Sequence, residues 1–201
     1  KAEDAVLVLG AERTRALVLA VPVFTRFEAG LCPGISTEEV WQHSVEVATF
    51  ARDISIQAGA PEVADAAFTA GLLHDVGKLL LAANLPAEYA VVRRHCEERC
   101  TAESEFEWER LGTSHAEAAA CLFGMWGLPL PVLEAIAHHH RPDLGDQTTF
   151  TPLTAVHVAN AFYYEPRQPE RSQLDLNYLN RLGLADMCNE WRLACGLPPL
   201  L

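Results

Sequence analysis

The chain has 201 residues, of which 50% are hydrophobic and 21% are charged, and its formal net charge is −12 at pH 7. This composition is typical of a folded globular protein and excludes an intrinsically disordered one. The excess of acidic residues disfavours a broad nucleic-acid-binding surface. The apolar stretch at residues 16–24 is too short to span a bilayer and follows no signal-peptide pattern, so we expect a cytoplasmic protein.

Helical periodicity runs through almost the whole chain, and no segment shows the convincing alternation of a strand. Ser36 or Thr37 is a suitable N-cap for the helix expected to end at about residue 58. The expected helices, in chain order, cover residues 3–9, 11–28, 37–58, a segment from Pro61 that includes 70–81, then 86–110 as one or two helices, 114–126, 131–141, 151–164 and 175–195. The sequence therefore predicts an all-α, bundle-like domain.

The stretch AGLLHDVGKLLL, residues 70–81, places His74 and Asp75 in an otherwise apolar run. Burying an unpaired imidazole or carboxylate is costly, so both side chains need partners. Asp75 lies on the apolar face of its helix, and Lys78 follows His74 by four residues, one turn along the same face. His43 is another possible partner, because it lies on the apolar stripe of the helix 37–58.

Further imidazoles are expected to face the interior from other helices. His139 and His140 continue the apolar face of the helix that begins at Pro131, and His115 lies at the start of its own helix. In the helix 151–164, Asn160 comes four residues after Val156, which is expected to face the interior, so Asn160 lies on the same face. Several imidazoles and one carboxylate that converge in one bundle predict a metal site, and this ligand chemistry suits iron, manganese, zinc or nickel.

The ordered motifs resemble the HD superfamily of metal-dependent phosphohydrolases, and more closely its HDOD branch of signalling output domains. The resemblance covers nearly all of the chain and implies an HD-domain-like helical bundle. The matching segments are WQHS (41–44), AGLLHDVGK (70–78), EWERLGTSHA (107–116), WGLP (126–129), HHRP (139–142), AVHVAN (155–160) and LDLNYL (174–179).

The resemblance also implies roles for single residues. The residues that match the HD metal ligands are His43, His74 and Asp75, with Asn160 at the position of a final Asp. His115, His139 and His140 match the additional ligands of the HD-GYP phosphodiesterases, which cleave cyclic dinucleotides, and Lys78 matches their phosphate-contacting lysine. The GYP segment itself is missing, because Arg-Pro-Asp-Leu follows His140.

The resemblance further implies a division of the chain and a set of partners. Residues 1–36 correspond to the end of the N-terminal helical lobe of an HDOD domain, and residues 37–201 correspond to its HD-like core. The first part of that lobe is absent from the sequence, so we expect a longer protein with an upstream receiver or other signalling domain. The expected partners are that domain and another protein, with no membrane or nucleic acid and with self-association left open.

Charge favours a regulatory role over catalysis. Two divalent ions bring four positive charges, whereas the matched ligands supply one carboxylate, Asp75, because Asn160 is neutral. The acidic stretch Glu97–Glu109 is expected to be a solvated helical face, apart from Glu107, which can add charge. We therefore expect a degenerate site in a signalling domain, either a metal-free hydrogen-bonded network or a site for one ion. The alternative is a metal-dependent phosphohydrolase acting on a cyclic nucleotide or other phosphoester.

Overall fold

The structure is a computed structural model that describes residues 10–27, 34–99 and 103–199. Over these residues the chain forms α-helices and short 3₁₀ turns and no strand, which confirms the all-α prediction. The expected helix at 3–9 lies outside the described residues. The α-helices are α2 (Ala11–Phe27), α3 (Thr37–Gln57), α4 (Ala64–Leu73), α5 (Val76–Asn84), α6 (Pro86–Arg99), α7 (Glu103–Leu111), α8 (His115–Met125), α9 (Leu130–His138), α10 (Pro152–Tyr164), α11 (Leu176–Arg181) and α12 (Cys188–Ala194).

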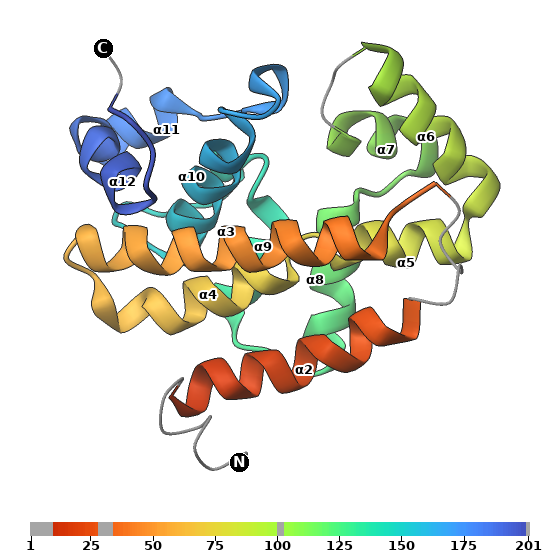
Figure 1. Ribbon diagram of the computed structural model, residues 1–201, viewed down its shortest axis with the longest axis horizontal. Helices are drawn as coiled ribbons and strands as arrows, with labels where there is room; N and C mark the ends of the chain where they lie inside the picture. The colour runs from red at the N-terminus through yellow and green to blue at the C-terminus, as the bar shows by residue number, and fades with distance from the viewer. Residues whose placement is uncertain (1–9, 28–33, 100–102, 200–201) are drawn as a thin grey trace.

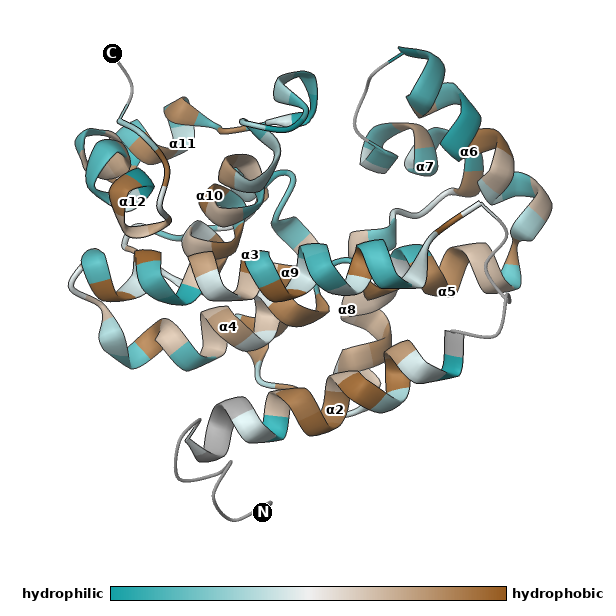
Figure 2. Ribbon diagram, in the orientation of Figure 1, coloured by the Kyte–Doolittle hydropathy of each residue, from teal (hydrophilic) through white to brown (hydrophobic). Residues whose placement is uncertain are grey.

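The centre of the bundle is built on α3 and α4, which lie side by side, with α9 and α10 packed against them (Figure 1). Gly71 on α4 permits this close packing, because a Cβ atom there would lie 2.8 Å from Ala48 Cα on α3. α2 packs against α4, and its Ala16 and Ala20 are part of the same buried core. The hydropathy colouring shows apolar residues concentrated on α2, α4 and α9, whereas α6 and α7 are largely hydrophilic (Figure 2).

The helix expected from Pro61 is interrupted, which corrects the prediction of one continuous segment. The 3₁₀ turn Pro61–Val63 leads into α4, which ends at Leu73, and α5 begins only at Val76. On a continuous helix, neighbouring residues point about 100° apart. The break between α4 and α5 instead lets His74 and Asp75 face one centre.

Pro61–Asn84 is long and apolar enough to cross a membrane. However, 72% of its most apolar part is buried inside the protein. Its apolar surface is therefore already covered by neighbouring helices, as in the central helix of a bundle.

The last helix, expected at 175–195, is also divided. α11 ends at Arg181, a 3₁₀ turn covers Ala185–Met187, and α12 follows. Gly183 has a φ of 69°, a left-handed conformation that glycine adopts without steric cost and that ends a helix.

Ser36 is the N-cap of α3, since its Oγ accepts a hydrogen bond from the backbone N–H of Glu39 at 3.1 Å. Of the two candidates that the sequence offers, Ser36 and Thr37, the structure therefore selects Ser36.

Candidate metal centre

Five imidazoles and one carboxylate meet where α3, α8, α9 and the α4–α5 break come together. We call this group the His/Asp centre, and its members are His43, His74, Asp75, His115, His139 and His140. The first five are at most 5% exposed, and His140 is partly buried. These side chains were expected to face the interior from separate helices, and the structure brings them together.

Asp75 lies in the middle of the His/Asp centre. Its Oδ2 is 3.3 Å from Nε2 of His43, and its Oδ1 is 3.5 Å from Nε2 of His74. Nε2 of His115 and of His139 lie 3.3 Å and 4.0 Å from the same Oδ1. One carboxylate is therefore shared by two sets of imidazoles, and in each set the ligand atoms lie within 4.8 Å of one another.

The opposite ring nitrogens are held by acceptors outside the centre. Nδ1 of His74 lies 2.7 Å from the carbonyl oxygen of Gly71, and Nδ1 of His139 lies 2.8 Å from that of Ile136. A carbonyl only accepts, so each Nδ1 carries the proton and donates. Each Nε2 is then an acceptor that points at Asp75, the orientation in which histidine binds a metal.

His115 and His140 are held by side chains. Nδ1 of His115 donates to Oε2 of Glu107 at 2.6 Å, and the other oxygen of Glu107 accepts from the hydroxyl of Tyr89 at 2.9 Å. Nδ1 of His140 lies 3.1 Å from Oε1 of Gln173. A carboxylate behind a ligating imidazole fixes its orientation and increases its basicity.

The charges in the centre favour cation binding. Burial lowers the pKa of His74 to about 3, and burial also lowers the pKa values of His43, His139 and His140, so these rings are neutral at neutral pH. For His115, burial opposes the positive charge, but Glu107 and Asp75 outweigh it and raise the pKa to about 9. A metal at His115 therefore replaces a proton.

Three buried atoms of the centre have no hydrogen-bond partner among the described residues: Nδ1 of His43, Oδ1 of Asp75 and Nε2 of His139. Such atoms are costly to bury without a partner. Oδ1 of Asp75 and Nε2 of His139 lie 4.0 Å apart, so one bound cation would satisfy both. The donor set, imidazole nitrogen with carboxylate oxygen, fits a divalent transition metal.

Beside the centre is a second group, which we call the Glu103 cluster: Lys78, Arg93, Glu103 and Arg171. Nζ of Lys78 lies 2.7 Å from Oδ2 of Asp75 and 3.2 Å from Oε2 of Glu103. Arg93 forms an ion pair with Glu103, and Nη2 of Arg171 lies 3.5 Å from it. Lys78 therefore connects the two groups.

Two sequence-based expectations are corrected here. Helical spacing places Lys78 on the face of His74, but the helix break directs it to Asp75, three residues before it. The acidic stretch is expected to be solvated apart from Glu107, yet Glu103 is only 2% exposed. Glu103 and Glu107 are one turn apart on α7 and share a face, a spacing that pointed to the missed residue.

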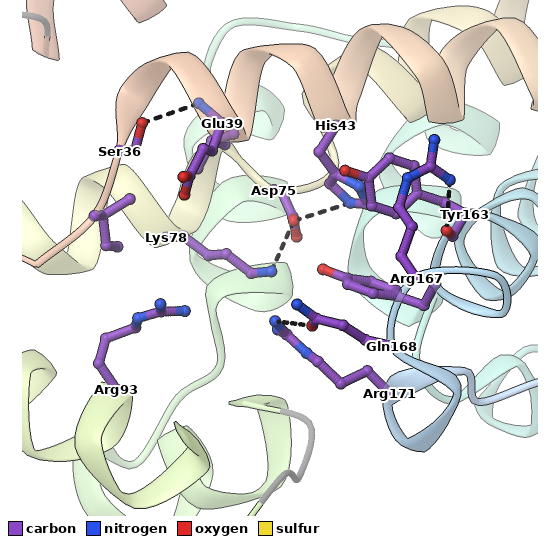
Figure 3. Close-up of a pocket in the computed structure, with 13 residues that line it drawn as sticks. Ser36, Glu39, His43, Asp75, Lys78, Arg93, Tyr163, Arg167, Gln168 and Arg171 are labelled. Atoms are coloured by element: carbon purple, nitrogen blue, oxygen red, sulfur yellow. Dashed lines mark hydrogen bonds and ion pairs between the residues drawn. The ribbon is translucent and has the colours of Figure 1, made fainter. Parts of the chain in front are cut away.

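A cavity of about 380 Å³ opens next to the centre (Figure 3). His43, Asp75 and Lys78 line it on the side of the centre, and the ring of Tyr163 packs edge-on against His43 with centroids 4.2 Å apart. The charged residues that line it are Glu39, Asp75, Lys78, Arg93, Arg167 and Arg171. In a chain of net charge −12, a cavity with four cationic side chains is unusual and suits an anionic ligand.

The position of Asn160 leaves its proposed role open. Asn160 lies on α10, is 7% exposed, and its Oδ1 has no hydrogen-bond partner among the described residues. Its assignment as a ligand stays a prediction. Sequence reasoning also missed His157 on the same helix, whose Nδ1 donates to the carbonyl oxygen of His139 at 2.8 Å and whose Nε2 accepts from the backbone N–H of Asp175 at 2.9 Å.

Several known proteins are similar to this chain in sequence or fold. Ribonuclease Y of Thermus thermophilus is 32% identical over 164 residues, 80% of this chain but 21% of that protein, so the chain spans about a fifth of its length. An HDOD domain protein of unknown function from Geobacter sulfurreducens has a similar fold, with a TM-score of 0.73 at 22% identity over 99% of this chain and 75% of that one. The response regulator MmoQ of Methylococcus capsulatus str. Bath matches with a TM-score of 0.53 at 26% identity, over 97% and 70% of the two chains.

The family of the chain follows from a match to a family model over residues 1–142. A model of the HDOD domain family matches residues 1–142, well over half of the sequence, and this range includes five imidazoles and the carboxylate of the His/Asp centre. The chain therefore belongs to the HDOD domain family.

Proposed function

We propose that the chain is a regulatory HDOD domain of a cytoplasmic bacterial signal-transduction protein, in which the His/Asp centre holds a divalent transition metal. The domain acts by contact with an upstream signalling domain and a protein partner rather than by turnover. The observation that carries this proposal is the composition of the centre, which has five imidazoles but a single carboxylate, Asp75. Such a centre retains a cation but balances little of the charge that two ions bring.

Two further observations support a regulatory role. The similarity to the response regulator MmoQ extends over almost the whole chain. Large apolar side chains are also exposed at the turn between α8 and α9, where Met125 is 74%, Trp126 52% and Leu130 65% exposed. Exposed apolar groups of this size are typical of protein contact surfaces.

The second candidate function is phosphoester hydrolysis at the same centre. The cationic cavity favours it, because Lys78 and Arg171 there would bind a phosphate next to Asp75. A bound ion would polarise the phosphoryl oxygens and lower the pKa of a water. RNA, the substrate class implied by the name Ribonuclease Y, is disfavoured by the net charge of −12.

One experiment separates the two functions. The chain is purified without chelator, its transition metals are measured, and hydrolysis of bis(p-nitrophenyl) phosphate is assayed with added Mn²⁺ or Fe²⁺. We expect bound metal without turnover, and slower hydrogen exchange at residues 70–82 when metal is present. Turnover that disappears in a folded Asp75→Ala variant would establish the phosphohydrolase instead.

A further inference from the structure

We propose that the ammonium of Lys78 takes the place of a second metal ion, so that the His/Asp centre holds one divalent ion although its ligands form two sets. The inference rests on the metal centre proposed above and specifies how many ions it binds. It follows from the position of one side chain, Lys78, relative to the two oxygens of Asp75.

The two ligand sets depend on Asp75 in different ways. The first set is His43, His74 and Asp75, in which His43 lies 3.3 Å from Oδ2 and His74 lies 3.5 Å from Oδ1. The second set joins Asp75 to His115, His139 and His140, and its imidazoles face Oδ1. A pair of ions would therefore need Asp75 as a bridge, with one ion at each oxygen.

Oδ2 already carries a cation. Nζ of Lys78 lies 2.7 Å from it, and the lysine side chain is only 9% exposed. A divalent ion on the same oxygen would lie a few ångströms from this ammonium, and in a buried site the repulsion between them is only weakly screened. The nearest partners of Oδ1 are Nε2 of His115 at 3.3 Å and Nε2 of His74 at 3.5 Å, and both of these rings belong to the proposed ligand sets.

Lys78 is also fixed in place from its far side. Its Nζ lies 3.2 Å from Glu103, and that carboxylate is held in turn by Arg93 and Arg171. Moving the ammonium away from Asp75 would disturb this buried cluster. The structure thus assigns one ion to the second ligand set and a fixed positive charge to the first.

This assignment has a chemical consequence. In two-metal sites both ions stabilise the attacking and leaving oxygens of a displacement. A lysine supplies charge and donors but no vacant coordination position. A centre with one ion and one ammonium is therefore suited to holding the helices together around a ligand rather than to two-metal hydrolysis.

The test counts ions on the purified 201-residue chain. Mn²⁺ bound at saturation is measured by equilibrium dialysis, and electron paramagnetic resonance distinguishes an isolated Mn²⁺ from an exchange-coupled pair. We expect one ion per chain with an isolated signal in the wild type, and two ions with a coupled signal in Lys78→Met. Lys78→Arg, which keeps the charge, is expected to bind one.

Arg167→Met is the matched control. It removes a cation from the same cavity, but Arg167 pairs with Glu46 at 2.6 Å and its guanidinium lies over Tyr163. We expect this variant to bind one ion. Lys78→Met leaves Glu103 with two guanidinium partners, which favours a folded variant. Two ions on the wild-type chain would overturn the role of Lys78 even if this variant did not fold.

The outcomes separate this inference from the proposed function. Two ions on the wild-type chain, or one ion on both the wild type and a folded Lys78→Met, would overturn the role of Lys78 and leave the metal centre intact. No ion on the wild type would overturn the metal centre itself.

Discussion

The His/Asp centre and the Glu103 cluster lie side by side but satisfy their buried polar groups in opposite ways. In the Glu103 cluster, one carboxylate is surrounded by three cationic side chains from α5, α6 and the 3₁₀ turn Pro169–Arg171. In the His/Asp centre, five imidazoles surround one carboxylate, and three buried atoms of the group have no hydrogen-bond partner among the described residues. A buried group that the protein pairs internally contributes to structure, whereas one left as an acceptor indicates a ligand.

Lys78 is the only described residue that forms ion pairs with both carboxylates, Asp75 and Glu103. Through it, the charge of one is coupled to that of the other, although the two residues are far apart in the sequence. A substitution in the Glu103 cluster should therefore alter the charge balance of the His/Asp centre, and the reverse.

Asp75→Ala should have the largest effect, because it removes the shared carboxylate and leaves the buried ammonium of Lys78 with Glu103 alone. Breaking a buried ion pair typically costs about 3–5 kcal/mol. We expect loss of bound metal and a fall of this size in the free energy of unfolding, measured in urea. Asp53→Ala, whose residue pairs with Arg52 near the surface, is the control and should change stability by less than about 0.5 kcal/mol. Unchanged metal content in Asp75→Ala would contradict the centre.

Glu103→Gln should alter the dependence of stability on acid. Burial alone would raise the pKa of Glu103, but Lys78, Arg171 and Arg93 outweigh it and lower the pKa from 4.5 to about 2. Because the folded pKa is below the unfolded one, this stabilisation is complete above about pH 4.5 and is lost as the pH falls towards 2. Its size is on the order of 3 kcal/mol.

The variant is expected to be less stable at neutral pH and to show a shallower loss of stability between pH 4.5 and 2, followed by urea unfolding at each pH. Glu105→Gln, an exposed position on the same helix, serves as the control. Wild-type and Glu103→Gln profiles that run parallel over this range would show that the Glu103 cluster does not stabilise the fold.

Gly77→Ala should disturb the His/Asp centre through packing alone. A Cβ atom at Gly77 would lie 1.9 Å from the carbonyl oxygen of His115, a backbone atom that cannot move without shifting the imidazole. Forced overpacking typically costs about 1–3 kcal/mol. We expect this loss together with weaker Mn²⁺ binding, measured by equilibrium dialysis.

Gly124→Ala is the matched control for that variant. Gly124 lies in α8, and its nearest neighbour to an added Cβ is a leucine methyl at 3.6 Å, an ordinary contact. Because alanine is the better helix former, by up to about 1 kcal/mol, this variant should be as stable as the wild type or more so. A Gly77→Ala chain with normal metal affinity would disprove the contact between α5 and His115.

His157→Phe should have the smallest effect. The variant removes the donor to the carbonyl oxygen of His139 and the acceptor for Asp175. Loss of a group that orients a ligand typically weakens metal binding by roughly 10-fold. Thr154→Val, which removes a buried hydrogen bond to Tyr178 on the same helix as His157, should cost similar stability without changing metal affinity. Equal metal affinities in the two variants would assign His157 a purely structural role.

The helical fold and most members of the His/Asp centre could be predicted from the sequence, because both depend on local periodicity. A histidine on an apolar helix face must be buried with a partner, so His43, Asp75 and His139 could be assigned to the interior from their spacing. The interruption of the helix at residues 74–75 could not be foreseen in this way, since His74 and Asp75 have no proline or other local break signal beside them. Just after the interruption, Gly77 lies against the backbone of His115, a contact between residues distant in the sequence that local periodicity cannot reveal.

The all-α fold, the inward-facing imidazoles and the inward-facing carboxylate could be read from the sequence, because side-chain direction on a helix follows from position along it. The pairing of charges could not: Glu103 lies in the interior beside two arginines, and Lys78 pairs with Asp75. Pairing of buried charges depends on distances between helices, and these are set by the packing of the whole bundle.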